Sequence, residues 1–212
     1  NRRPARAAVR FRKAASAGAG TPRRFRSRGR LRFLDDGALL WARDLGYPCP
    51  VQDVFPIVNA APDGGYAISA GFQGTAVLGA GEPNETVLGP TPEDRLDLLI
   101  ARYDSDGLLL WARQSYGGLE DLSSSDNYSM NPMAFLDSGE LVLSGNYRQG
   151  EITLGQGEPN QMILAEDNNY RAFISMFYPN GNLAWAFSQE GTSDVIASTL
   201  SSYGDSTFFV GS

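Results

Sequence analysis

The pentapeptide Leu-Leu-Trp-Ala-Arg at residues 39–43 recurs unchanged at residues 109–113, and Leu-Ala-Trp-Ala-Phe follows at residues 183–187. The three copies contain all 3 Trp of the chain. An Asp-Gly or Asn-Gly pair stands at the same distance before each copy, and these pairs favour hairpins because a type I′ turn needs positive φ at both central positions. We therefore expect three equivalent hairpins, with turn glycines and second-strand tryptophans at Gly37 and Trp41, Gly107 and Trp111, and Gly181 and Trp185.

Two further segments repeat between these hairpins. Residues 62–71 resemble residues 136–145, which aligns Gly71 with Gly145, and a third copy that includes Gly211 starts at residue 205. The tetrapeptide Gly-Glu-Pro-Asn occurs at residues 81–84 and again at residues 157–160. Together the patterns predict four main strands and a short β excursion in each unit. The strands are expected near 54–60, 65–72, 97–103 and 108–114, and near 131–136, 140–147, 171–177 and 182–188.

Repeated units of four antiparallel strands are typical of the blades of a β-propeller. We therefore predict an all-β fold, a partial β-propeller of four-stranded antiparallel blades with about 70 residues per repeat. Two other repeat folds fit less well, because a β-sandwich needs about seven strands per domain and the coils of a β-solenoid are shorter. The predicted boundaries are a basic Arg-rich segment at 1–29, the end of a blade at 30–46, full blades at 47–118 and 119–191, and the start of a further blade at 192–212.

The sequence is expected to be a fragment, because it starts with Asn1 and stops inside a copy of the repeat. An incomplete ring of blades exposes a sheet edge, which predicts poor solubility or self-association. No run approaches the ~18 apolar residues of a membrane span, and no signal peptide is visible.

The composition excludes several chemistries. The chain has no His, which removes His-based catalytic triads and imidazole metal sites. Its 1 Cys, Cys49, cannot form an internal disulfide or a thiolate zinc cluster and is interpreted as a small loop residue. We therefore expect neither an enzyme active site nor a bound cofactor.

The net charge of −6 hides two opposite segments. Residues 1–32 hold 12 of the 18 Lys and Arg and none of the 24 Asp and Glu, so the remainder is strongly acidic. Three interpretations stay open for the basic segment: a tail that binds phosphate or anionic lipid, a dock for the acidic body, or the product of a shifted reading frame. A nucleic-acid partner is expected only if the basic segment belongs to the protein.

Two acidic groups are candidate sites. Asp104 and Asp106 are a weak candidate for Ca²⁺ binding, but a Ca²⁺ loop needs more oxygen ligands, and the other copies of this turn lose carboxylates. A hairpin turn explains all three copies. The second group, Glu93, Asp94 and Asp97, is either an acidic rim for a cation or basic partner or a set of solvated loop residues.

The chain resembles the bacterial β-propeller repeat family known as SBBP-type repeats over roughly residues 30–212. The resemblance rests on Tyr-Asp-Ser-Asp-Gly at residues 103–107 followed by Leu-Leu-Trp-Ala, and on Asp63-Gly64 followed by Gly-Phe-Gln-Gly at residues 71–74. It implies a bacterial protein that is secreted or exposed at the cell surface, with a role in binding or scaffolding. It supplies no catalytic residues.

Three functions are compatible with these observations. The first is a non-enzymatic, secreted or cell-surface propeller that binds a protein or a glycan through its loops. The second is a non-catalytic part of a larger enzyme whose active site lies outside this chain. The third is a structural repeat array of a surface protein.

Overall fold

The computed structural model describes residues 29–33, 39–44, 56–92, 96–117, 132–147, 150–165, 169–189 and 194–211, with the backbone alone for the first two ranges. All regular structure in these ranges is β-strand, which confirms the predicted all-β class. The strands are β1 (Gly29–Phe33), β2 (Leu39–Asp44), β3 (Ile57–Ala60), β4 (Tyr66–Phe72), β5 (Ala76–Leu78), β6 (Thr86–Leu88), β7 (Asp97–Tyr103), β8 (Leu109–Gln114), β9 (Met133–Phe135), β10 (Leu141–Tyr147), β11 (Ile152–Leu154), β12 (Met162–Leu164), β13 (Arg171–Phe177), β14 (Leu183–Ser188), β15 (Ala197–Tyr203) and β16 (Ser206–Gly211).

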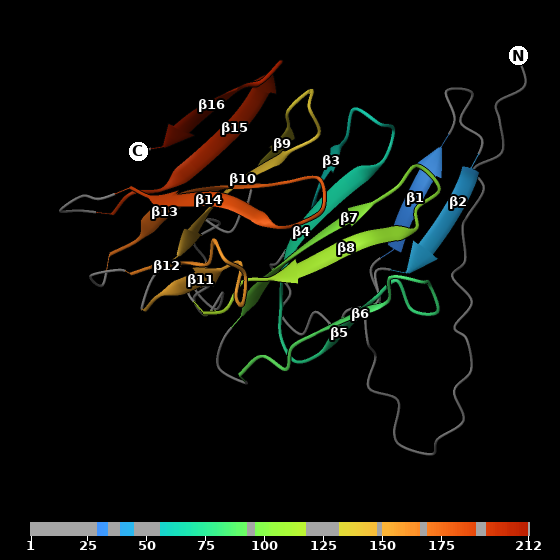
Figure 1. The fold of residues 1–212 in the computed structure, drawn as a ribbon, viewed down its shortest axis with the longest axis horizontal. Helices are drawn as coiled ribbons and strands as arrows, with labels where there is room; N and C mark the ends of the chain where they lie inside the picture. The colour runs from blue at the N-terminus through green and yellow to red at the C-terminus, as the bar shows by residue number, and fades with distance from the viewer. Residues whose placement is uncertain are drawn as a thin grey trace, which may run out of the picture.

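Two four-stranded antiparallel sheets form the centre of the molecule (Figure 1). The first sheet has the order β3-β4-β7-β8, and the second sheet has the matching order β9-β10-β13-β14. Two further hairpins, β1–β2 and β15–β16, lie at opposite ends of this pair of sheets. The described residues contain no closed ring of sheets.

The three hairpins that contain a tryptophan, β1–β2, β7–β8 and β13–β14, share one irregularity of strand register. The pairing shifts between Arg102 and Tyr103 in β7–β8, between Met176 and Phe177 in β13–β14, and between Arg32 and Phe33 in β1–β2. This shared shift shows that the three Trp-containing hairpins predicted from the sequence have the same backbone construction.

The expected correspondence between Gly71 and Gly145 is wrong by one residue. Leu99 of β7 holds the place that Phe173 holds in β13. Phe173 pairs with Gly145, but Leu99 pairs with Ala70 and not with Gly71. The hairpin turns agree with this shift, because Gly64 and Gly139 both have positive φ and donate equivalent hydrogen bonds. Sequence comparison had matched the small residues of the strand rather than the turn.

A short hairpin extends from each sheet, as the sequence predicted. β5 pairs with β6, and β11 pairs with β12. The second of these hairpins also contacts the first unit, because Tyr116 and Thr153 exchange both main-chain hydrogen bonds.

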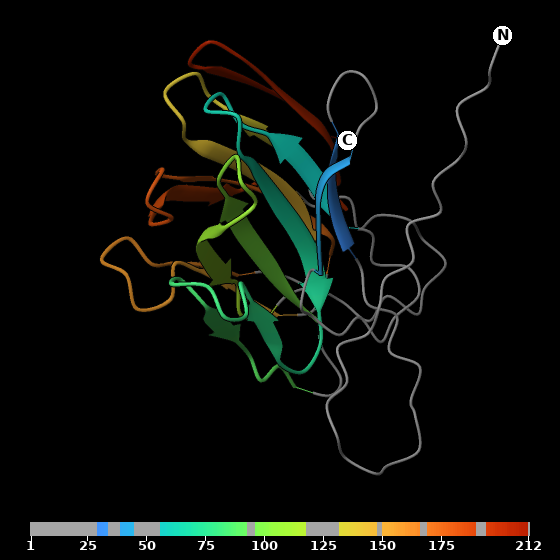
Figure 2. The same ribbon diagram turned by 90° about the vertical axis from the view of Figure 1, so that its right-hand side faces the viewer.

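The largest core cluster lies between the two sheets. It joins Leu98, Ile100 and Trp111 of the first sheet to Leu143 and Phe173 of the second, all buried. A smaller cluster joins the far face of the second sheet to Leu200 of β15. The sheets therefore stack face to face, and Figure 2 shows this stacking from the side.

Several sequence predictions lie outside the described residues, among them Gly37, Cys49, Glu93, Asp94 and the basic segment up to residue 28. Within the part of the chain that is described, no helix has the length and apolarity needed to cross a membrane.

Candidate functional site

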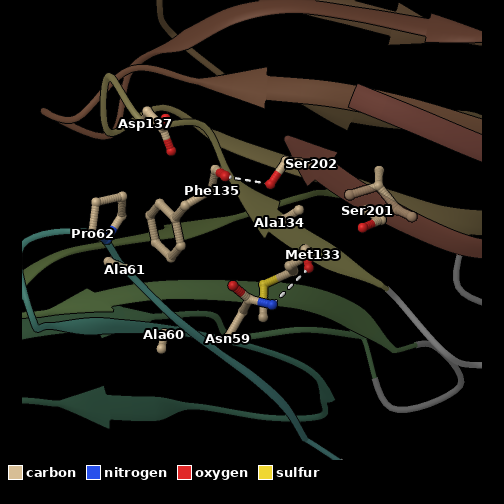
Figure 3. A pocket seen from close by; sticks show the side chains of 11 residues that line it. Asn59, Ala60, Ala61, Pro62, Met133, Ala134, Phe135, Asp137, Ser201 and Ser202 are labelled. Carbon is tan, nitrogen blue, oxygen red and sulfur yellow. Dashed lines mark hydrogen bonds between the residues drawn. The ribbon is translucent and has the colours of Figure 1, made fainter. Parts of the chain in front are cut away.

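A polar groove lies where the first strands of the hairpins β3–β4, β9–β10 and β15–β16 meet. It has a volume of about 420 Å³ and is bordered by β3, β9 and β15 with the turns that follow β3 and β9. We call it the inner-strand groove. Figure 3 shows its lining residues, which are Asn59, Ala60, Ala61, Pro62, Met133, Ala134, Phe135, Asp137, Leu200, Ser201 and Ser202.

The groove exists because β3 and β9 are edge strands of their sheets. An edge strand presents main-chain groups that no neighbouring strand pairs. Side chains bridge these edges: Asn59 Nδ2 donates to Met133 O at 3.0 Å, and Ser202 Oγ donates to Phe135 O at 2.5 Å. Both bridges are drawn in Figure 3. Polar side chains thus bridge the three strands, which do not form one continuous sheet.

A buried arginine contacts Phe135, one of the residues that line the groove. The Arg102 guanidinium lies 4.8 Å from the centre of the Phe135 ring and donates from Nη2 to Asp63 Oδ1 at 2.6 Å. Desolvation acts to raise the pKa of Asp63, but the hydrogen bond from Gly65 N–H and the interactions with Arg102 outweigh it, so this pKa lies below its usual value. Arg102 therefore fixes Phe135 against the Asp63 turn.

The open side of the groove offers hydrogen-bonding groups and one negative charge. Asp137 and Ser201 are exposed, and Asn59 and Ser202 are partly exposed. The Asp137 carboxylate lies at the rim on the turn after β9 (Figure 3). Such a lining suits a polar or cationic ligand that also forms hydrogen bonds with the main-chain groups of the strand edges.

Asp104 and Asp106 form a turn in the structure. Asp104 Oδ1 accepts hydrogen bonds from the N–H groups of Asp106, at 2.9 Å, and Leu108, at 2.8 Å. No group of three or more Asp, Glu, Cys or His side chains suited to a metal ion occurs among the described residues. The hairpin turn accounts for the Asp104 carboxylate.

Asp97 lies in the interior and not on an acidic rim. Its carboxylate accepts a 2.5 Å hydrogen bond from Gln114 Nε2 and a 3.1 Å hydrogen bond from Gly117 N–H. The buried network ties the start of β7 to the end of β8.

Trp111 joins the two sheets. Its indole Nε1 donates to Pro179 O in the turn of the next hairpin at 2.9 Å, and its ring stacks on Phe177 at 6.3 Å. An added Cβ at Gly181 would lie 2.6 Å from Trp111 Cδ2, and Gly181 has φ +85°. The tryptophan therefore requires glycine in the turn that it contacts.

Trp185 holds the equivalent place in the second sheet but lacks this partner. It is only partly buried, and its ring lies 5.3 Å from that of Phe187, which is 61% exposed. Trp41 lies on β2, where only the backbone is described.

The repeated Gly-Glu-Pro-Asn segment holds the edge of each sheet. Leu109 N–H donates to Glu82 Oε2 at 2.6 Å, and Leu183 N–H donates to Glu158 Oε2 at the same distance. The Asn two residues later donates back to the carbonyl of the same leucine, at 3.0 Å from Asn84 and 3.3 Å from Asn160. We call each Glu–Asn pair an edge clamp.

The groove residues were missed by sequence reasoning. Asn59 and Ser202 lie outside the repeated motifs, and their meeting depends on how the sheets stack. The one available signal was Arg102, a charge inside the otherwise nearly apolar stretch at residues 98–103. No protein-family model matches the chain, and no significant match to a curated protein is found.

Proposed function

We propose that the chain is a non-enzymatic binding module, part of a β-propeller whose central channel is lined by β3, β9 and β15. The support for this arrangement is that β9 contacts both β3 and β15, so the first strands of the hairpins β3–β4, β9–β10 and β15–β16 lie side by side. In a propeller the first strands of the blades surround the axis, and ligands bind at the mouths of the channel and on the loops.

The ligand that suits the groove best is an extended protein segment that carries Lys or Arg. The edges of β3 and β9 offer main-chain groups to an extended chain, and Asp137 places a carboxylate at the rim. The acidic excess of residues 33–212 attracts cationic segments from a distance. This single observation, a polar groove on converging strand edges with an acidic rim, carries the proposal.

The absence of catalysis is proposed from chemistry. The whole chain has no His, and the groove lining contains neither Cys nor Lys that would act as a nucleophile. By resemblance to SBBP-type repeats, we propose that the module acts outside a bacterial cell or on its surface.

The test uses three extended peptides that differ only in a central Lys, Ala or Glu. We expect the Lys peptide to bind most tightly, because only its charge complements Asp137. Chemical shifts in ¹⁵N-labelled protein should change along β3, β9 and β15 when it binds.

The substitution Asp137→Asn should weaken Lys-peptide binding about tenfold, since a hydrogen bond to a charged group contributes about 1.5–3 kcal/mol. Glu151→Gln removes an exposed carboxylate just before β11, outside the groove lining, and should leave binding unchanged. Equal binding of the Lys and Glu peptides, or an Asp137→Asn protein that binds like the original, would contradict the proposal.

A further inference from the structure

The turn between β13 and β14 contains the one Asn-Gly pair of the whole chain, Asn180-Gly181. Asparagine is among the thermally labile residues of proteins, because the main-chain nitrogen of the next residue can attack its side-chain carbonyl carbon. A glycine in that next position has no Cβ to hinder the approach. Every other Asn of the chain is followed by a residue that has a Cβ.

The side chain of Asn180 is placed as the electrophile of this reaction. Asn180 is exposed, so water reaches it and ammonia is free to leave. Its Oδ1 accepts a 3.0 Å hydrogen bond from Asn182 N–H. When a nitrogen adds to Asn180 Cγ, negative charge develops on this same Oδ1, and a donor that is already in place stabilises such charge.

The nucleophile of the reaction is held back by a hydrogen bond. Gly181 N–H donates to Tyr178 O at 2.8 Å, and this bond closes the turn. The nitrogen must lose its proton before it attacks, so the hydrogen bond has to open first. A hydrogen bond of ordinary strength slows such a step about fivefold and does not prevent it.

We propose that Asn180 deamidates spontaneously in the folded protein, and that the isoaspartate product releases Trp111 from this turn. The Gly181 nitrogen gives its proton to hydroxide and forms a bond to Asn180 Cγ. The bond from Cγ to the side-chain nitrogen breaks, and that nitrogen takes a proton from water and leaves as ammonia. The product is a succinimide ring.

Water opens the succinimide ring in two ways. Addition at Cγ breaks the bond from Cγ to the Gly181 nitrogen and gives aspartate at position 180, with the normal main chain. Addition at the main-chain carbonyl carbon of residue 180 breaks the other bond to that nitrogen and gives isoaspartate. In isoaspartate the main chain runs through Cβ and Cγ of residue 180 and is therefore longer.

The longer main chain lies at the place where Trp111 contacts the turn. Trp111 Nε1 donates to Pro179 O at 2.9 Å, before position 180, and its ring lies against Gly181, after that position. The two contact points move apart in isoaspartate, so the indole cannot keep both. The aspartate form keeps the normal main chain and an acceptor for Asn182 N–H, and it should leave Trp111 in place.

The modification thus acts on the contact between the two four-stranded sheets, because Trp111 joins them. It needs neither a ligand nor a partner. The inference is therefore independent of the binding proposal, and its experiments use no peptide.

Peptide mapping by mass spectrometry tests whether Asn180 deamidates. The whole chain is kept folded at mildly alkaline pH and digested at intervals, and each Asn-containing peptide is assayed for aspartate and isoaspartate. We expect Asn180 to convert before any other Asn, at a rate about fivefold below that in urea, where the bond to Tyr178 is absent. The matched control Asn180→Ser keeps an oxygen for Asn182 N–H and cannot form the ring.

The indole N–H of Trp111 in ¹⁵N-labelled protein tests the release. Chromatography separates the aged protein into its aspartate and isoaspartate forms, and circular dichroism checks that both are folded. Exchange of the indole proton should be at least about fivefold faster in the isoaspartate form than before ageing, because its hydrogen bond is lost. Exchange should be unchanged in freshly prepared Asn180→Asp.

Each half of the inference has an outcome that overturns it. An Asn180 that stays intact in the folded protein, while it converts in urea, would overturn the deamidation site. An isoaspartate form whose Trp111 indole is as protected as before ageing would overturn the release. Equal loss of protection in Asn180→Asp would also overturn it, because the new charge and not the longer main chain would then be the cause.

Discussion

At the scale of single residues, Trp111 and Trp185 hold equivalent positions in the two sheets but have different surroundings, so they provide a matched comparison. Trp111 is 7% exposed and bonded to the next turn, whereas Trp185 lacks such a turn. Trp111→Ala should lower the free energy of unfolding by about 3–5 kcal/mol, and Trp185→Ala should lower it much less.

Urea unfolding followed by circular dichroism measures both changes. Trp111→Phe should retain most of the packing and lose the indole hydrogen bond, at a cost of about 1 kcal/mol. Equal losses for the two alanine variants would show that Trp111 does not join the sheets.

The sequence identified these residues but not their contacts. Trp111, Gly107 and Gly181 were predicted from a local turn rule, and both glycines have positive φ. The predicted type I′ turn is wrong, however, because Gly107 N–H donates to Asp104 O and Gly181 N–H donates to Tyr178 O. Each glycine therefore holds the fourth position of its turn and not a central one. Asn59 and Ser202 were not predicted, because each bonds to a main-chain carbonyl on another strand, 74 and 67 residues away in sequence. No local pattern contains such a pairing.

At the scale of elements, the edge clamp explains why Gly-Glu-Pro-Asn repeats. Glu158→Ala would leave the N–H of Leu183, a buried residue, without its acceptor, and an unsatisfied buried donor costs about 1–3 kcal/mol. We expect Glu158→Ala to destabilise the protein by about this amount and to speed amide exchange at the start of β14.

Glu158→Gln keeps an acceptor oxygen and should recover most of the loss, while Glu151→Ala, at an exposed glutamate just before β11, should be neutral. If Gln fails to rescue, the ion pair with Arg113 and not the main-chain bond is the important contact.

Hairpins were the elements that the sequence predicted best. Their turns contain Asp-Gly or Asn-Gly, and their strands are short, mainly apolar runs next to those turns, so both β7–β8 and β13–β14 follow from local rules. The alignment of β4 with β10 was wrong by one residue because the five residues between β3 and β4 and the five between β9 and β10 differ in composition. A one-residue slip reverses the face of every side chain in a strand, so only the cross-strand register resolves it.

At the scale of the whole molecule, the core between the sheets should make them one cooperative unit. Leu143 is fully buried there, in a cluster with side chains from both sheets. Leu143→Ala should therefore cost about 2–5 kcal/mol, and the loss should appear equally in both sheets although the residue belongs to the second. Native-state hydrogen exchange measures this directly: the opening free energies of amides in β4 and β10 should fall together.

The control is Val87→Ala, at an exposed valine on β6, which should change neither opening free energy by more than about 0.5 kcal/mol. A loss confined to β10 would mean that each sheet unfolds on its own. Each four-stranded unit would then be a separate folding domain, and the groove between β3 and β9 would open whenever one of them unfolds.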